Sequence, residues 1–343
     1  MAERQLTPAE RMTLFQQNTR QHMKMLPSRP VVPNSTTSFE LVKTRLTSRI
    51  MLLVTGTVRV AHASLTTIPL APFSPATLLR SVRLSINNGF NPFQVSGRGL
   101  FMHNHLYIGG ETMSEVASLG NVASVGGVDN QFRLLLELPI SLNQRDAIGL
   151  INTSNPQTVV SVDVDFDDIA RLFTTVAGYT ITPTLTITPM VESFSIPSNP
   201  NAVPDLSVLK LVHEFNQTIT STGNFTFELQ TGTTYRKIIA IFERADGVGF
   251  TEAETGNLEL VFNQSDIPYT VHPTILRNLN AKAYSHPLPA GVYVFDFSNL
   301  GIPNYGGSRD YVDTERLSEF WLSGTLGQTG RLTVITETLA RLG

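Results

Sequence analysis

One strand signature occurs twice in this sequence, with the same internal spacing each time. The tripeptide Phe-Glu-Leu begins at Phe39 and again at Phe227, and an apolar run begins eleven residues later, at Ile50 and at Ile238. Both halves end on a similar threonine-rich segment, 185–188 in the first and 332–336 in the second. Self-similarity at a fixed spacing constrains the architecture before any site is considered. Unless the match is a chance similarity of β-rich segments, it predicts two β domains built on one plan.

The pattern of apolar residues is that of strands through most of the chain. Apolar and polar residues alternate over 82–86, 132–138 and 160–166 in the first half, and again over 258–262 and 292–294. Asn87-Asn88-Gly89 is a turn signal that favours a hairpin after the first of these runs. Short strands separated by turn residues are typical of sandwiches and barrels. The sequence therefore predicts an all-β fold, with a short helix over 167–176.

Composition excludes several other classes. Of 343 residues, 41% are apolar and 15% charged, which is typical of a globular chain long enough for two cores. The longest apolar runs have five residues, against the roughly 20 that a membrane-spanning helix needs. Arg4, Glu10 and Arg11 interrupt any apolar core of a signal peptide. Cysteine is absent, which excludes disulfides and thiolate metal sites.

Residues 1–30 form a basic arm on an acidic body. They carry five Arg or Lys and two Glu, while the whole chain has a net charge of −3. Thr7 followed by Pro8 and Glu10 is typical of a helix start. A narrow and partly apolar stripe then follows helical spacing and ends where three prolines begin. Its positions are Met12, Phe15, Thr19, His22, Met23 and Leu26. We expect this amphipathic helix to dock on its own body, on a neighbouring molecule or on a lipid surface.

A proline-rich segment divides the two β-rich halves. Residues 196–205 contain three prolines and two asparagines, which is typical of a semi-rigid linker. The expected divisions are a helical arm and proline-rich strap over 1–34, a first sandwich over 35–195, a linker over 196–210 and a second sandwich over 211–343.

Three short segments, in this order, resemble a known family. They are Gln5–Ala9 with the Gln- and Asn-rich helix after it, Pro204–Leu211, and Pro289–Tyr293. With them, the chain resembles the double jelly-roll major capsid proteins, most of all those of tectiviruses, the icosahedral phages with an internal membrane. The resemblance implies two tandem jelly-roll β-sandwiches with an N-terminal amphipathic helix. None of the three segments is a catalytic signature.

The resemblance also implies a function, partners and a location. The protein would assemble as homotrimers, pseudo-hexagonal capsomers that tile an icosahedral shell over a membrane, after synthesis in the host cytoplasm. Its partners would be neighbouring capsomers, minor capsid and vertex proteins and, through the arm, the viral membrane, with no cofactor and no sequence-specific nucleic acid. The loops 117–130 and 301–310 would contact other subunits or face outward. The expected contact residues of the arm are Arg4, Arg11, Met12, Phe15, Arg20, Met23 and Lys24.

Two clusters raise the question of a metal site. His103 and His105 would share one face of a strand and could chelate a metal, but no third ligand is close in sequence. Asp163, Asp165 and Asp167 would crowd one face of a strand, as in oxygen-rich calcium sites. The spacing of an EF-hand is missing, however, and a solvated strand face explains the alternation more simply. We expect no metal site.

No motif predicts catalysis. Phosphate-binding loops and serine nucleophile elbows are absent from the sequence, so we expect a structural protein and not an enzyme. The first alternative is a tandem carbohydrate-binding β-sandwich protein. Its aromatic platforms are not evident, since the aromatic residues are mostly Phe and Trp321 is expected in a core or a trimer interface. The second alternative is a glycoside hydrolase with paired carboxylates among Asp163–Asp168.

Overall fold

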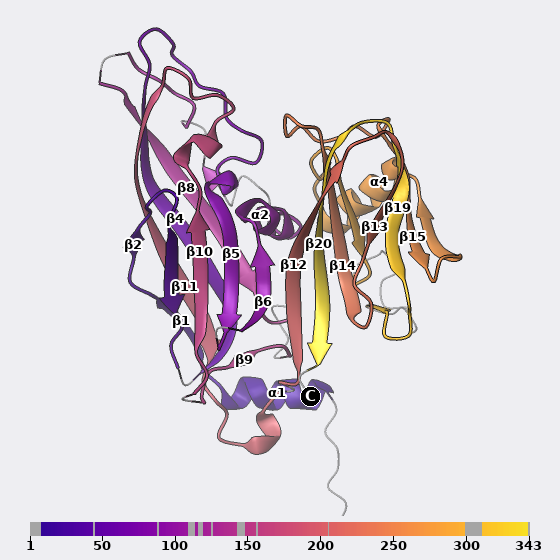
Figure 1. Cartoon of the computed structure of the whole chain (residues 1–343). Coiled ribbons are helices and arrows are strands. Elements are labelled where there is room, and N and C mark those ends of the chain that lie inside the picture. Colours follow the sequence, from indigo (N-terminus) through magenta and orange to yellow (C-terminus); the bar gives the residue numbers. More distant parts are fainter. Residues whose placement is uncertain are drawn as a thin grey trace, which may run out of the picture. The chain divides into compact units, whose positions relative to one another are not determined.

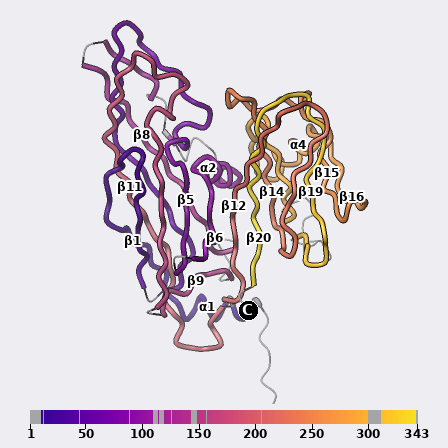
Figure 2. Tube along the Cα trace, viewed as in Figure 1, coloured from indigo at the N-terminus to yellow at the C-terminus, as the bar shows by residue number. Residues whose placement is uncertain are grey.

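The computed structural model divides into two compact units (Figures 1 and 2). Unit 1 comprises Met1–Asn104, Gly110–Lys210 and Arg341–Gly343, and unit 2 comprises His105–Gly109 and Leu211–Ala340. The structure describes residues 8–43, 45–87, 89–108, 114–115, 119–124, 126–142, 148–155, 157–204, 206–298 and 311–341.

Unit 1 is a sandwich of two antiparallel sheets. One sheet has the order β1-β11-β4-β8-β7, with β2 beside β11 and β9 beside β4, and the other contains β6-β5-β10-β3. The helices are α1 (Pro8–Asn18) and α2 (Gly97–His105), with 3₁₀ turns η1 (Ala76–Leu78), η2 (Ile169–Leu172) and η3 (Pro200–Ala202). The strands are β1 (Gln21–Met25), β2 (Arg29–Pro30), β3 (Thr36–Glu40), β4 (Leu46–Ala61), β5 (Leu79–Ile86), β6 (Phe90–Val95), β7 (Ser114–Glu115), β8 (Val128–Pro139), β9 (Ile151–Asn152), β10 (Val160–Phe166) and β11 (Thr180–Phe194).

Unit 2 is a second sandwich of two antiparallel sheets. One contains β17-β14-β20-β12, with β18 beside β14, and the other has the order β13-β19-β15-β16. Its helix is α4 (Pro273–Tyr284). The strands are β12 (Val208–Ile219), β13 (Gly223–Glu228), β14 (Thr234–Glu243), β15 (Thr255–Phe262), β16 (Asp266–Val271), β17 (Val292–Asp296), β18 (Val312–Asp313), β19 (Phe320–Leu326) and β20 (Gly330–Arg341).

The two units follow one strand plan, as the sequence repeat predicts. In the described chain, the orders β1-β11-β4-β8 and β3-β10-β5-β6 of unit 1 correspond to β12-β20-β14-β17 and β13-β19-β15-β16 of unit 2. The corresponding strands also occur in the same order along the chain, and in both units a helix follows the hairpin, α2 after β6 and α4 after β16. The repeated apolar runs lie within β4 and β14. The prediction of two β-sandwiches built on one plan is confirmed.

Alternation along the strands separates core from surface. The apolar residues of β10 are buried while the residues between them are partly exposed, as expected for a strand with one face on a core. Strands β14 and β17 are instead buried along nearly their whole length, although β17 is the last strand at its end of the sheet order. Aromatic side chains fill the core of unit 2, where the largest fully buried ones include Tyr235, Tyr293, Phe242 and Phe295.

A buried asparagine links the helix to the sheet in each unit. Asn104 of α2 donates to the carbonyl oxygen of Glu137 at 2.7 Å and accepts from its backbone N–H at 2.6 Å. Asn280 of α4 makes the same pair of bonds with Val294, at 2.8 and 3.0 Å. Glu137 faces Met51 across β8 and β4, and Val294 faces the corresponding Ile239 across β17 and β14. The helix asparagine therefore satisfies the same backbone groups in both repeats.

The predicted N-terminal helix is shorter than expected. It begins at Pro8 as predicted but ends at Asn18, and Gln21–Met25 form strand β1 instead of two further turns. Antiparallel pairing with β11 satisfies the backbone of this segment, so a tertiary contact overrides the helical spacing of its side chains. The helix predicted over 167–176 is likewise only the short turn η2.

Candidate functional site

The arm is held to unit 1 by one aromatic anchor. Phe15 of α1 is buried with Leu46 and Leu150, and its ring meets that of Phe194 edge to face at 5.3 Å between centroids. At the end of α1, the side chain of Asn18 donates to Leu14 O, and that of Thr19 to Phe15 O. The sequence left open whether this helix docks on its own body, on a neighbouring molecule or on lipid. In the structure, Phe15 of the helix packs on the body of its own chain.

The next part of the arm adds a strand to the sheet. β1 pairs with β11 from Gln21 opposite Phe194 to Met25 opposite Met190, and β2 pairs with the same strand farther along. β1 is the last strand at its end of the sheet order, and four of its five residues are exposed. Met23 is 53% exposed and Met25 63% exposed. The arm thus presents a sheet edge with exposed methionines.

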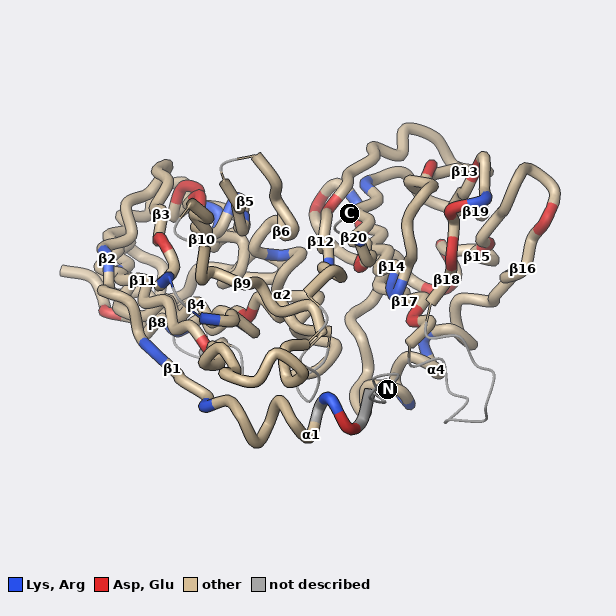
Figure 3. The backbone as a smooth tube through the Cα atoms, turned by 90° about the horizontal axis from the view of Figure 1, so that it is seen from below, with Lys and Arg blue, Asp and Glu red and all other residues tan. Residues whose placement is uncertain are grey.

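The expected contact residues of the arm fall into three groups. Arg11, Arg20, Met23 and Lys24 are exposed in unit 1, whereas Phe15 is buried and is not available for contact with a partner. Met12 lies within α1, and Arg4 lies outside the described residues. In Figure 3, β1 carries basic colour and no acidic colour, because Gln21–Met25 contain Lys24 and neither Asp nor Glu.

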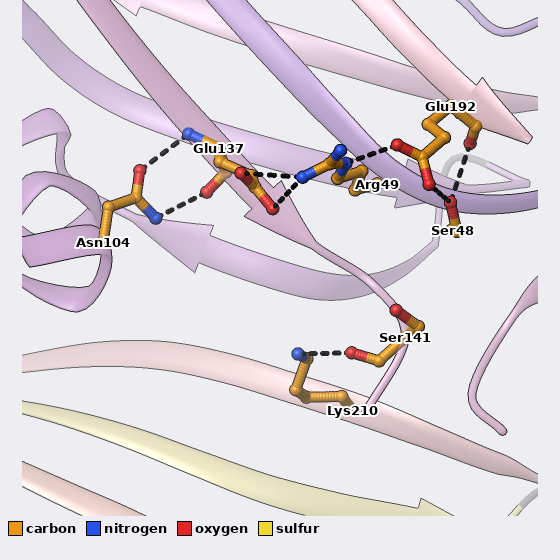
Figure 4. A network of polar contacts seen from close by, with 7 residues as sticks. All are labelled: Ser48, Arg49, Asn104, Glu137, Ser141, Glu192 and Lys210. Carbon is orange, nitrogen blue, oxygen red and sulfur yellow. Dashed lines mark hydrogen bonds and ion pairs between the residues drawn. The ribbon is translucent and has the colours of Figure 1, made fainter. Parts of the chain in front are cut away.

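A base lies between two acids in each unit, at corresponding positions; Arg49 is partly buried and Lys237 fully buried. In unit 1, Nε of Arg49 lies 2.6 Å from Glu192 Oε2 and Nη1 lies 3.5 Å from Glu137 Oε1 (Figure 4). In unit 2, Nζ of Lys237 lies 3.5 Å from Glu337 Oε1 and 4.0 Å from Asp296 Oδ2. Both bases directly precede the repeated apolar run, so they occupy the same position in the two copies of the sequence repeat.

A β-bulge precedes the base in both copies. Opposite β11, Ser48 is the extra residue of β4, and its hydroxyl donates to Glu192. Opposite β20, Arg236 is the extra residue of β14, and its guanidinium lies 3.3 Å from Glu337. The bulged residue therefore contacts the same acid that pairs with the base.

The second copy is the more deeply buried and the more elaborate. The hydroxyl of Tyr107 accepts a hydrogen bond from Lys237, and the hydroxyl of Tyr284 donates to Asp296 Oδ2 at 2.5 Å. Burial alone would lower the pKa of Lys237, but Glu337 and the other anionic and polar neighbours raise it, so the ammonium stays charged. Burial and the charge of Asp296 raise the pKa of Tyr284. Lys237, Glu337 and Asp296 thus form a buried ionic framework, in which each charged group has a charged or hydroxyl partner.

The two suspected metal clusters have other roles. The strand predicted around His103 and His105 is wrong, because both lie in helix α2, where positions i and i+2 point in different directions. Asp163 and Asp165 lie on β10, and Asp163 pairs with Arg83 at 3.7 Å. Among the described residues, no three His, Asp or Glu side chains are grouped to hold a metal ion.

The remaining acids of this strand face are also engaged by the protein. Asp165 accepts from the hydroxyls of Thr36 and Ser81, at 2.5 and 2.6 Å. Burial acts to raise the pKa of Asp165, but these hydrogen bonds outweigh it and lower the pKa. Asp167 pairs with Arg80 at 3.1 Å. The alternating aspartates therefore fit the solvated strand face that the sequence favoured over a calcium site.

The remaining sequence candidates are Trp321 and the two loops 117–130 and 301–310. Trp321 lies partly buried on β19, next to the buried Phe320 and across from Glu228 and Val261. Loop 301–310 lies outside the described residues, and so does part of loop 117–130. In the portions of the chain that the structure describes, no helix has the length and hydrophobicity to cross a membrane.

Solved structures to which this chain is similar include those of viral major capsid proteins. The STIV major capsid protein, from Sulfolobus Turreted Icosahedral Virus, matches with a TM-score of 0.72 and 13% identity, over 94% of this chain and 97% of that one. The fold is a double jelly roll. The major capsid protein P2 of bacteriophage PM2 shares it with a TM-score of 0.58 and 12% identity, over 94% of this chain and 98% of P2.

This chain is also similar to a third viral capsid structure. The PBCV-1 virus capsid protein matches with a TM-score of 0.65 and 12% identity, over 94% of each chain. No protein-family model and no curated protein matches the sequence. The double jelly-roll fold expected from the sequence is confirmed, while the closer resemblance to tectivirus proteins stays a prediction.

Proposed function

We propose that this chain is a viral major capsid protein that self-assembles as pseudo-hexagonal trimeric capsomers into an icosahedral shell. The observation that carries the proposal is the extent of the likeness to the STIV protein, which covers 94% of this chain and 97% of that one. Both jelly rolls are therefore matched together, in one chain and in one order.

The geometry of the chain supports a trimer. Each copy supplies two sandwiches of one plan, so three copies supply six similar sandwiches, the number that a hexagonal building block needs. The ion pairs of Arg49 and Lys237 are satisfied within their own units, so assembly would use other surfaces. Many contacts of standard interface size, repeated over a closed shell, would stabilise it. We assign no catalytic step to any residue.

The arm is the proposed contact between capsomers and their surroundings. Because Phe15 is buried against unit 1, the exposed Arg11, Arg20, Met23 and Lys24 are the residues that would contact neighbouring capsomers, minor capsid and vertex proteins or a membrane. The protein would be made in the host cytoplasm and reside in the virion.

The test is the mass of the purified full-length chain by multi-angle light scattering, followed by electron microscopy of the same fraction. We expect three times the chain mass of 37.7 kDa, and particles with a pseudo-hexagonal outline. The full chain is used because removal of residues 1–34 would also remove Phe15 from its apolar cluster and β1 from the sheet. A monomer at every concentration would overturn the proposal and favour the tandem carbohydrate-binding alternative.

A further inference from the structure

Two neighbouring depressions lie where α1 passes into β1 in unit 1. The larger has a volume of about 670 Å³ and is lined by the arm together with Arg45, Ser195 and Ile196. The smaller has a volume of about 200 Å³ and is lined by β1, Arg45 and parts of β4 and β11. His22 and Arg45 line both. Together they form one basic depression.

Among the described residues, the side chains around this depression include several cations and no acid. Arg20, Arg45 and Lys24 line it with His22, and neither Asp nor Glu is among the lining residues. Several other arginines of unit 1 have acidic partners, as Arg59 has Asp129 at 3.8 Å and Arg80 has Asp167 at 3.1 Å. Within the part of the chain that the structure describes, no carboxylate is within ion-pair distance of Arg20 or Arg45.

The backbone holds both arginines in place while their guanidinium groups are open to a ligand. Arg20 N donates to the hydroxyl of Ser195 at 2.9 Å, and Ser195 N donates to Arg20 O at 2.9 Å. Arg45 N donates to Thr153 Oγ1 at 3.2 Å, and Arg45 O accepts from the Thr153 N–H and hydroxyl at 2.9 and 2.8 Å. Fixed attachment points reduce the entropy lost when a ligand orders the side chains.

Side-chain hydrogen bonds offset part of the negative charge at the end of helix α1, beside the depression. Carbonyl groups at a helix C-terminus carry partial negative charge that would repel an anion. Asn18 and Thr19 line the depression, and their side chains donate to carbonyl oxygens of Leu14 and Phe15 in the last turns. These bonds engage part of the negative end of α1, and the arginines add positive charge beside it.

We propose that the basic depression binds a phosphate ester group, the chemistry shared by phospholipid headgroups and small phosphorylated molecules. Two guanidinium forks match the oxygen atoms of a phosphate, which Arg binds in bidentate fashion. Ile196, which is 43% exposed, lines the larger depression, and Met23 lines the smaller one. Cations next to exposed apolar side chains are typical of surfaces that bind lipid headgroups. The lipid source rests on the proposed capsid function, whereas the phosphate site itself does not.

The test compares variants of the full-length protein in two binding assays. Isothermal titration with glycerol 3-phosphate and with inorganic phosphate measures binding of a soluble phosphate. Flotation with phosphatidylcholine vesicles, with and without phosphatidylglycerol, measures binding of a headgroup. The variants are Arg20→Gln, Arg45→Gln and the double change, with Arg171→Gln as the matched control. The side chain of Arg171 is 70% exposed in unit 1, lies outside the arm and lines neither depression.

We expect the double variant to weaken binding about tenfold or more, and the control by less than about twofold. Arg45→Lys keeps the charge but loses the fork, so its affinity should be intermediate. Binding of the soluble phosphates identifies a small ligand, and binding of phosphatidylglycerol vesicles alone identifies a headgroup. An equal loss in Arg171→Gln, or no binding by the unaltered protein, would overturn the inference. Trimers that bind no phosphate would refute this site alone, and monomers that bind it would refute the capsid proposal alone.

Discussion

Replacing Lys237 by Met tests whether the buried ionic framework stabilises unit 2. The side chain of Lys237 is 3% exposed, and it lies between Glu337, also 3% exposed, and Asp296, 2% exposed. Methionine has a similar length and fits the same space without the charge. The substitution therefore leaves two carboxylates in a buried site from which their shared cation has been removed.

The expected loss of unfolding free energy follows from this burial. Removing one partner of a buried ion pair destabilises a protein by about 3–5 kcal/mol, because the remaining charge is uncompensated. Arg236 still lies 3.3 Å from Glu337, and the hydroxyl of Tyr284 still donates to Asp296, so we expect the lower part of that range. For a domain of this size, about 3 kcal/mol corresponds to a fall in melting temperature of roughly 10 °C.

Differential scanning calorimetry of the full-length chain measures this fall. Lys43→Met is the matched control, since Lys43 pairs with Glu40 at 3.6 Å but both side chains are largely exposed, 42% and 59%. Its expected effect is about 0.5 kcal/mol or less. Adding Glu337→Gln to Lys237→Met should recover part of the loss by removing one uncompensated charge. If Lys237→Met melts at the same temperature as the control, the framework does not stabilise the unit and the reasoning is refuted.

Three further predictions concern stability. Asn280→Ala leaves the buried N–H and C=O of Val294 without partners and should lower the unfolding free energy by about 2–4 kcal/mol, measured by urea titration. The lowered pKa of Asp165 stabilises the folded state above its unfolded pKa, and this contribution is lost as the pH falls through the folded value. Asp165→Asn should therefore flatten the fall in melting temperature at acid pH, and an unchanged slope would contradict the assignment. Gly291→Ala should lower stability by at least about 2 kcal/mol in the same urea titration, since Gly291 has φ of +75° and an added Cβ would lie 2.2 Å from Phe242 O.

The sequence was sufficient to predict the architecture because the repeat and the alternation are local signals. The apolar runs at Ile50 and Ile238 became the central strands β4 and β14, and the tripeptides at Phe39 and Phe227 became the ends of β3 and β13. Gly291 in one of the family-like segments has a physical explanation, the left-handed turn before β17. Such features depend on residues near each other in the chain.

Features that depend on distant residues were not predicted. Residues 21–25 carry a helical spacing, yet β11, which lies at the far end of the first half of the sequence, pairs with them as a strand. The assignment of 105–109 to unit 2 was not expected either. The basic depression was missed because Arg20 and Arg45 are brought together by contacts with distant residues, such as Ser195 and Thr153. The signal available in the sequence was the excess of basic residues in the arm, which does not identify a partner.

The base that precedes each apolar run was visible in the sequence. Its role in the fold follows only from the register in which its strand pairs with the neighbouring strand. Lys237 is opposite Glu337, and Thr336 and Thr338 flank that acid on β20. A slip of one residue would place a threonine opposite the buried ammonium and move the carboxylate to the other face of the sheet. The bulge at Arg236 and the ion pair therefore specify one register together, as Ser48 and Arg49 do in unit 1. Because a buried charge without its partner is strongly unfavourable, we infer that the repeated pair excludes wrong pairings of the central strands as well as stabilising the correct one.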